Sequence, residues 1–256
     1  MPFTLAHPAA ILPLRGVRHL RMAPLMVGAV APDLPYYLPW GVARYMHFTH
    51  AFRHSFTIDL ALGYALLASL VLLQRPLTAL LSARARALCV RALVPFRRPI
   101  EWALAAPAIL LGVWTHLLWD SFTHSDGWMV HRVEALSAPL VLGPYNGTVC
   151  HALQYLSSVV GLCVLVLWYG RLPRPAVSIG PDAAHSAAVP VLLLLTTAAV
   201  LIGGVQAVVQ FRHTHSVYQL FDVLLINALF WFACLYLIAG IVLTLEPGEP
   251  PSAADD

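Results

Sequence analysis

The stretch WALAAPAILLGVWTHLLWDSF, residues 102–122, decides the fold because it is long and apolar enough to cross a bilayer. About 20 consecutive apolar residues span the hydrocarbon core as a helix. This run nevertheless carries His116 and Asp120, whose spacing of four places them on one face of the helix. A carboxylate inside an apolar helix is costly, so a partner that compensates its charge is expected nearby.

The rest of the chain is similarly apolar, with 59% hydrophobic residues, 11% charged residues and a mean hydropathy of +0.75. Soluble domains carry about 25% charged residues, so this composition indicates an integral membrane protein. Further long apolar runs cover residues 56–74, 150–169, 188–209 and 222–245. The stretch 22–40 is also apolar, but its four prolines predict a broken or re-entrant segment. We therefore expect an all-α polytopic membrane helix bundle with five spanning helices plus this broken N-terminal segment.

The connection 75–100 contains six arginines and no acidic residue. The positive-inside rule predicts that it faces the cytoplasm of the membrane that the chain crosses several times. The helices on either side are antiparallel, so their other ends meet at the opposite membrane face. We expect a metal-site domain in residues 1–170, followed in 171–256 by additional transmembrane helices and an acidic cytoplasmic tail. A full crossing by 22–40 would instead give six spans.

His116 and Asp120 can grip one metal ion together, because residues four apart are neighbours on a helix. His124 lies about 12 Å from His116 along an unbroken helix, which is too far for all three to share one ion. Either the helix ends near residues 121–123 and folds His124 back, or Asp120 bridges two ions. Nitrogen and carboxylate ligands suit zinc, and also manganese or iron.

Other polar residues are expected to join this site. His54 begins the helix that is antiparallel to 102–122, so it should lie at the same membrane face. His7 and Asp33 come from the N-terminal segment, and Asp59 lies one turn into the first span. In a hydrolytic site Asp33 or Asp59 would accept a proton. The alternative is a polar bundle core in which the same side chains form only interhelical hydrogen bonds.

Five blocks of the sequence resemble an uncharacterised bacterial membrane family, the domain of unknown function numbered 4184. The blocks are MPFTLAHPAAILPL (1–14), GAVAPDLPYYL (28–38), RHSFTIDL (53–60), THLLWDSFTHSDGW (115–128) and LQYLSSVVG (153–161). The resemblance runs through about residues 1–170 and implies a multi-pass protein of the bacterial inner membrane. The order of His and Asp is also similar to that of inner-membrane proteins regarded as metal-dependent hydrolases, and distantly to zinc-dependent phospholipase C and single-strand nucleases.

This wider resemblance implies metal ligands at His7, Asp33, His54, His116 and Asp120, with His124 as a further candidate. The segment THAFRHSF offers both His50 and His54 for one position, and the serine that follows His54 favours it.

Two functions follow from these observations. The first is a membrane-embedded, metal-dependent hydrolase of a phosphoester or lipid phosphoester, with zinc as the cofactor and membrane lipid as its partner. The second is a non-catalytic membrane protein whose His/Asp cluster is structural or supports a partner or a solute path. The basic connection is explained by topology, so no nucleic-acid partner is expected.

Overall fold

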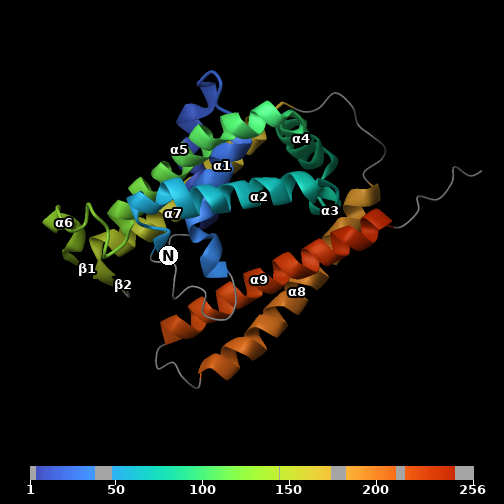
Figure 1. The fold of residues 1–256 in the computed structure, drawn as a ribbon. Coiled ribbons are helices and arrows are strands. Elements are labelled where there is room, and N and C mark those ends of the chain that lie inside the picture. Colours follow the sequence, from blue (N-terminus) through green and yellow to red (C-terminus); the bar gives the residue numbers. More distant parts are fainter. Residues whose placement is uncertain (1–3, 38–47, 144, 174–182, 212–216, 246–256) are drawn as a thin grey trace, which may run out of the picture. The chain divides into compact units, whose positions relative to one another are not determined.

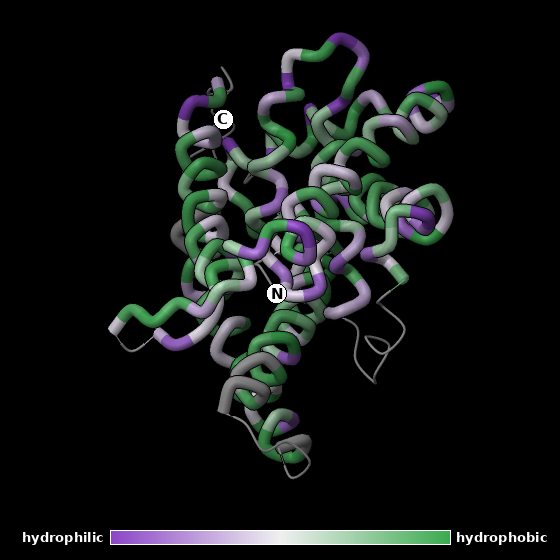
Figure 2. The backbone as a smooth tube through the Cα atoms, turned by 90° about the vertical axis from the view of Figure 1, so that its left-hand side faces the viewer, coloured by the Kyte–Doolittle hydropathy of each residue, from purple (hydrophilic) through white to green (hydrophobic). Residues whose placement is uncertain are grey.

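The computed structural model describes residues 4–37, 48–143, 145–173, 183–211 and 217–245, which are almost entirely helical (Figure 1). The helices long and apolar enough to cross a membrane are Phe52–Leu72, Pro99–Thr123, Val149–Arg171, Ala188–Val209 and Val223–Leu245. Figure 2 shows that hydrophobic residues make up most of the helical backbone that is coloured. The five predicted runs are therefore present as helices, and the all-α polytopic membrane bundle is confirmed.

The chain divides into two compact units, of which the first comprises Met1–Ser69 and Ala92–Arg174. Its N-terminal elements are η1 (Thr4–Gly16), α1 (Met22–Val30), η2 (Ala31–Tyr37), η4 (Phe52–His54), η5 (Ser55–Asp59) and the greater part of α2 (Leu60–Leu72). Its later elements are η6 (Val94–Arg97), α5 (Pro99–Thr123), α6 (Glu134–Ser137), β1 (Pro139–Leu142), β2 (Tyr145–Thr148) and α7 (Val149–Arg171). The strands form an antiparallel hairpin in which Pro139 pairs with Thr148.

The broken N-terminal segment is two short pieces rather than a span. Helix α1 has nine residues and continues into η2, a 3-10 helix with Pro32 and Pro35. Proline lacks the N–H that an α-helix needs in its interior, so the α-helical pattern cannot continue through this sequence. The described part of the stretch 22–40 therefore ends its α-helix at Val30, as its prolines predict. Residues 38–40 lie outside the described residues.

Helices α1 and α5 touch backbone to backbone, and glycine makes this possible. A Cβ atom on Gly112 would lie 2.2 Å from the carbonyl oxygen of Leu25, and one on Gly28 would lie 2.1 Å from that of Ile109. No larger residue fits at either position without moving a helix. A bidentate pair between Arg21 and Glu101, at 2.7 and 3.0 Å, joins the N-terminal ends of the two helices.

Around this contact the first unit builds its core. Element η1 packs on α1, α5 and α7, and the buried core side chains are those of Ile11, Leu12, Leu25, Ala29 and Ala108. Burial of these side chains stabilises η1, because a 3-10 helix of this length is unusual by itself. The result is a rigid frame that carries His7, Asp33 and His116 on three different elements.

The second unit comprises Leu70–Arg91 and Pro175–Asp256. Its helices are α3 (Gln74–Thr78), α4 (Ala83–Leu93, whose last two residues belong to the first unit), α8 (Ala183–Phe211) and α9 (Val217–Leu245). Helices α8 and α9 form an antiparallel pair, in which Trp231 Nε1 donates to Gln206 Oε1 at 2.9 Å. Helix α9 also holds α3, since the hydroxyl of Tyr236 donates to the carbonyl of Leu77 at 3.0 Å.

Candidate metal centre

Helix α5 presents His116 and Asp120 one turn apart, and both are buried. His116 Nε2 lies 3.1 Å from Asp120 Oδ2. On the other side of the ring, Nδ1 lies 2.8 Å from the carbonyl oxygen of Ala29 in α1. That carbonyl is available because the last carbonyls of a helix have no partner within it. A carbonyl can only accept, so Nδ1 carries a proton, and Nε2, which faces Asp120, is the nitrogen that can exchange its proton for a cation.

Element η2 brings a second buried carboxylate, Asp33, to the same place. Its Oδ1 lies 3.6 Å from His116 Nε2. Its Oδ2 accepts a hydrogen bond of 2.6 Å from the hydroxyl of Thr4, which itself accepts one of 2.6 Å from the hydroxyl of Tyr37. This chain of hydrogen bonds holds the Asp33 carboxylate with one oxygen directed at His116.

His50 completes the group from the turn that precedes η4. Its Nε2 lies 3.3 Å from Asp33 Oδ1, 3.3 Å from Asp120 Oδ2 and 3.4 Å from the Nε2 of His116. Its Nδ1 lies 3.2 Å from the hydroxyl of Thr49, which donates its proton to the carbonyl of Pro32 at 2.8 Å. The hydroxyl therefore accepts from Nδ1, so Nε2 is the His50 nitrogen that can exchange its proton for a cation.

The ligand atoms of Asp33, His50, His116 and Asp120 all lie within 4.8 Å of one another. Two bare imidazole nitrogens and two carboxylate oxygens repel each other unless a cation or protons lie between them. Asp120 Oδ2 is buried and has no hydrogen-bond partner in the described part of the chain. The two carboxylates carry a charge of −2, which a divalent cation neutralises. These four residues fit a metal ion, because two nitrogens and two oxygens are a donor set that zinc accepts.

Two further histidines face the other oxygen of Asp120. His7 Nε2 lies 3.0 Å from Asp120 Oδ1, and the His7 ring stacks on His116 with centroids 3.9 Å apart. His124 Nδ1 lies 3.5 Å from the same oxygen. Helix α5 ends at Thr123, and the extended backbone of His124 turns its side chain back toward Asp120. Of the two arrangements open from the sequence, the structure contains the folded-back histidine.

The position expected for His54 is occupied by His50. His54 is half-buried, accepts a hydrogen bond of 3.0 Å from Arg53 Nε and packs edge-on against Phe48. The expectation assumed a regular α-helix from this residue onward, whereas the chain here is a 3-10 turn followed by the π-helix η5. The sequence signal for His50 was its place in THAFRHSF, four residues before His54.

Asp59 is fully buried in η5, and neither carboxylate oxygen has a hydrogen-bond partner among the described residues. It lies outside both the four-residue group and the cavity beside it.

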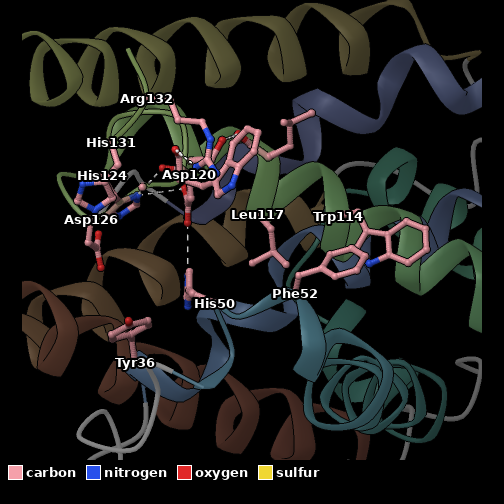
Figure 3. Close-up of a pocket in the computed structure, with 14 residues that line it drawn as sticks. Tyr36, His50, Phe52, Trp114, Leu117, Asp120, His124, Asp126, His131 and Arg132 are labelled. Carbon is pink, nitrogen blue, oxygen red and sulfur yellow. Dashed lines mark hydrogen bonds and ion pairs between the residues drawn. The ribbon is translucent and has the colours of Figure 1, made fainter. Parts of the chain in front are cut away.

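A cavity of about 900 Å³ opens beside the group, and His50 and Asp120 belong to its wall. In Figure 3, Phe52 and Trp114 lie to one side of this pair, while His124, Asp126 and His131 lie to the other. The remaining lining residues are Tyr36, Leu117, Leu118, Ser121, Gly127, Trp128 and Arg132. The four-residue group is therefore reachable from a cavity with one apolar and one polar side.

The electrostatics of the cavity wall favour positive charge near the group. Burial lowers the pKa of His50, but the carboxylates of Asp120 and Asp33 outweigh this and raise it to about 10. Burial raises the pKa of Asp33, but the hydrogen bond from His50 and the nearby His116 and His7 bring it below its usual value. Protons and metal cations therefore compete for the same place, so metal affinity should fall as pH falls.

Comparison with known proteins places this sequence in a family. The chain matches a family described as a domain of unknown function, DUF4184, over residues 1–245, which extends the resemblance beyond residue 170. No curated protein and no solved structure matches the chain. The match covers nearly the whole sequence and includes every residue of the four-donor group. The chain belongs to the DUF4184 family.

Proposed function

We propose that this protein is a membrane-embedded, metal-dependent hydrolase of phosphoesters, including lipid phosphoesters. One observation carries the proposal: two imidazole nitrogens and two carboxylate oxygens converge at the wall of a cavity large enough for a substrate. A structural metal site is closed on all sides, whereas a catalytic site keeps a position open. His50 and Asp120 line the cavity, which supports an open position on that side.

In this proposal Asp33, His50, His116 and Asp120 bind the cation, and zinc is the first candidate because it accepts mixed nitrogen and oxygen ligands. Such a cation supplies a Lewis acid and activates water as a nucleophile. Thr4 and Thr49 act as positioning residues, since their hydroxyls orient Asp33 and His50. His7 and His124, whose ring nitrogens lie near Asp120 Oδ1, remain candidate metal ligands.

Two carboxylates were expected to accept a proton, and their surroundings differ. Asp33 has one oxygen occupied by Thr4 and the other directed at the two histidines, which suits a ligand. Asp59 has no hydrogen-bond partner among the described residues, but it does not line the cavity. We therefore propose Asp33 mainly as a ligand. Asp59 could act as a base only through a proton carrier between it and the cavity.

The order of histidines and aspartates, which resembles that of metal-dependent hydrolases, adds support for a hydrolytic reaction. The substrate class follows from the cavity, whose apolar side suits a hydrocarbon and whose polar side includes His124, His131 and Arg132. Of these, Arg132 carries a permanent positive charge, and a guanidinium recognises phosphate through charge-assisted hydrogen bonds.

The test is metal content together with hydrolysis by the purified full-length protein. Wild type loaded with zinc should retain the metal, whereas His116→Ala should lose it. The control His131→Ala changes a cavity histidine outside the four-donor group and should keep the metal. Wild type should hydrolyse a chromogenic phosphoester or a phospholipid, lose this activity to a chelator and regain it with zinc.

Two results would count against the proposal in different ways. Equal metal content in wild type and His116→Ala would show that the four-residue group is not a metal site. Metal that is retained, with no hydrolysis of either substrate class, would favour the alternative of a structural or partner-supporting cluster.

A further inference from the structure

The cavity beside the four-residue group has an apolar wall made by residues of two predicted spans. Phe52 lies in η4 at the start of the span Phe52–Leu72, whereas Trp114 and Leu118 lie on α5. The opposite side is made by residues that follow α5, including His124, His131 and Arg132. Figure 3 shows the Asp120–His50 pair between Phe52 and Trp114 on one side and His124 and His131 on the other, with Arg132 close to Asp120.

The apolar wall is continuous with the outer surface of these spans. Phe52 is 63% exposed and Leu118 is 60% exposed, although both line the cavity. Phe56, also exposed, extends this surface: its ring centroid lies 5.8 Å from that of Trp114 and 5.9 Å from that of Phe52. Exposed side chains on a membrane span face the acyl chains of lipids, so the apolar wall leads from the cavity toward the hydrocarbon phase.

We propose that this wall is a lateral portal through which a membrane phospholipid enters the cavity. Its acyl chain lies along Phe52, Trp114 and Leu118, and its phosphate lies near the His50–Asp120 pair, within reach of the polar side. The placement of the phosphate near the His50–Asp120 pair rests on the hydrolase function proposed above. Binding of the lipid is a separate property of the wall.

The physical reason for a lateral route is the surroundings of the acyl chain. A lipid that reached the cavity through water would first have to leave the bilayer. Its acyl chain would then be exposed to water, which is unfavourable for each methylene group. A chain that slides from the bilayer onto Phe52 and Leu118 stays in apolar surroundings throughout. A water-soluble phosphoester gains nothing from exposed aromatic residues at the mouth of its site.

Charge also favours a phosphate at the inner end of the portal. Arg132 lies with its guanidinium carbon 3.9 Å from the centre of the Trp128 ring and donates to the Trp128 carbonyl at 3.2 Å. These contacts hold the cation at the cavity wall, and guanidinium groups bind phosphate oxygens well. Asp126, also in the wall, is a competing negative charge, so phosphate binding depends on Arg132 and the cation site together.

The experiment uses full-length protein in nanodiscs that contain a phosphatidic acid with a diazirine on its acyl chain close to the glycerol. After illumination, attached lipid is mapped by peptide mass spectrometry. Labelling of Phe52, Trp114 or Leu118 should fall severalfold when unlabelled phosphatidic acid is added, because a portal is a saturable site. Labelling of Val159 on α7, which is 61% exposed, should not change because it reports bulk lipid.

Matched variants separate the portal from the bulk surface. Leu118→Ala should weaken the competable labelling, whereas Val159→Ala, at an equally exposed span position, should leave it unchanged. The proposal is overturned if portal labelling is no more competable than that of Val159. It is also overturned if soluble glycerol phosphate competes as well as the lipid, because the chain then contributes nothing. Metal content, measured on the same samples, shows separately whether the metal site of the proposed hydrolase is intact.

Discussion

Replacing Thr4 with valine removes a hydroxyl that touches no candidate metal directly, yet it should weaken metal binding. The hydroxyl donates to Asp33 Oδ2 at 2.6 Å and fixes the direction of Oδ1 toward His50. A hydrogen bond to a charged group contributes about 1.5–3 kcal/mol. Loss of a residue that orients a ligand typically lowers metal affinity by about 10- to 100-fold. Since tenfold corresponds to about 1.4 kcal/mol, the two magnitudes agree.

Zinc affinity of the purified protein, measured by competition with a chromophoric chelator, tests this expectation. The matched control is Thr115→Val, because Thr115 neighbours His116 but donates only to the carbonyl of Gly112 within its own helix, at 2.7 Å. Tyr37→Phe, which removes the next hydroxyl in the chain, should have a smaller effect than Thr4→Val. If Thr4→Val binds zinc as tightly as wild type, or if Thr115→Val loses as much affinity, the orienting role of Thr4 is refuted.

Three further changes test the site and the frame that supports it. His50→Ala should lower zinc affinity by more than about 100-fold in the same chelator competition, whereas His54→Ala should leave the affinity unchanged. A larger loss of affinity in His54→Ala than in His50→Ala would identify His54 as the ligand. Asp59→Leu replaces a buried carboxylate, which lacks a hydrogen-bond partner in the described chain, with an apolar side chain of similar shape, and thermal unfolding should show stabilisation of about 1–3 kcal/mol. A loss of stability would reveal an interaction that the structure does not contain. Gly112→Val should destabilise the protein by about 3 kcal/mol or more, because the new Cβ would overlap the backbone of α1. Gly170→Val should change stability only slightly, because a Cβ there meets nothing within 4 Å. Equal unfolding temperatures for the two variants would contradict the close approach of α1 and α5.

The membrane helices were predictable because hydrophobicity summed over about 20 residues is a strong signal. Their boundaries shifted by a few residues, since a helix continues past its apolar part when the flanking residues can still form hydrogen bonds. The 3-10 helix Thr4–Gly16 was not predicted, because only its packing on α1, α5 and α7 stabilises it. The hairpin at 139–148 was likewise missed, since a short strand gives little periodicity.

Within the candidate site, the sequence predicted contacts between residues that are close in the chain better than contacts that depend on the fold. The pairing of His116 with Asp120 follows from helical periodicity, and the return of His124 was one of two arrangements left open. The sequence offered both His50 and His54, and the choice between them could not be made because it depends on a 3-10 turn and a π-helix whose hydrogen-bond pattern leaves no periodic signal in the sequence. The orienting roles of Thr4 and Thr49 were not predicted, because the role of a single hydroxyl depends on hydrogen-bond partners that only the structure reveals.

The contact between α1 and α5 has a consequence for the order in which the protein is made. Ala29 and His116, joined by a hydrogen bond, are 87 residues apart in the chain. At about 5–20 residues per second, synthesis separates their emergence from the ribosome by roughly 4–17 seconds. Helix α1 is too short to cross a bilayer and must wait through this interval without the helix that covers it. Ribosomes stalled before residue 99 should therefore hold a nascent chain whose first helix is open to chaperones or proteases, and completion of α5 should close it.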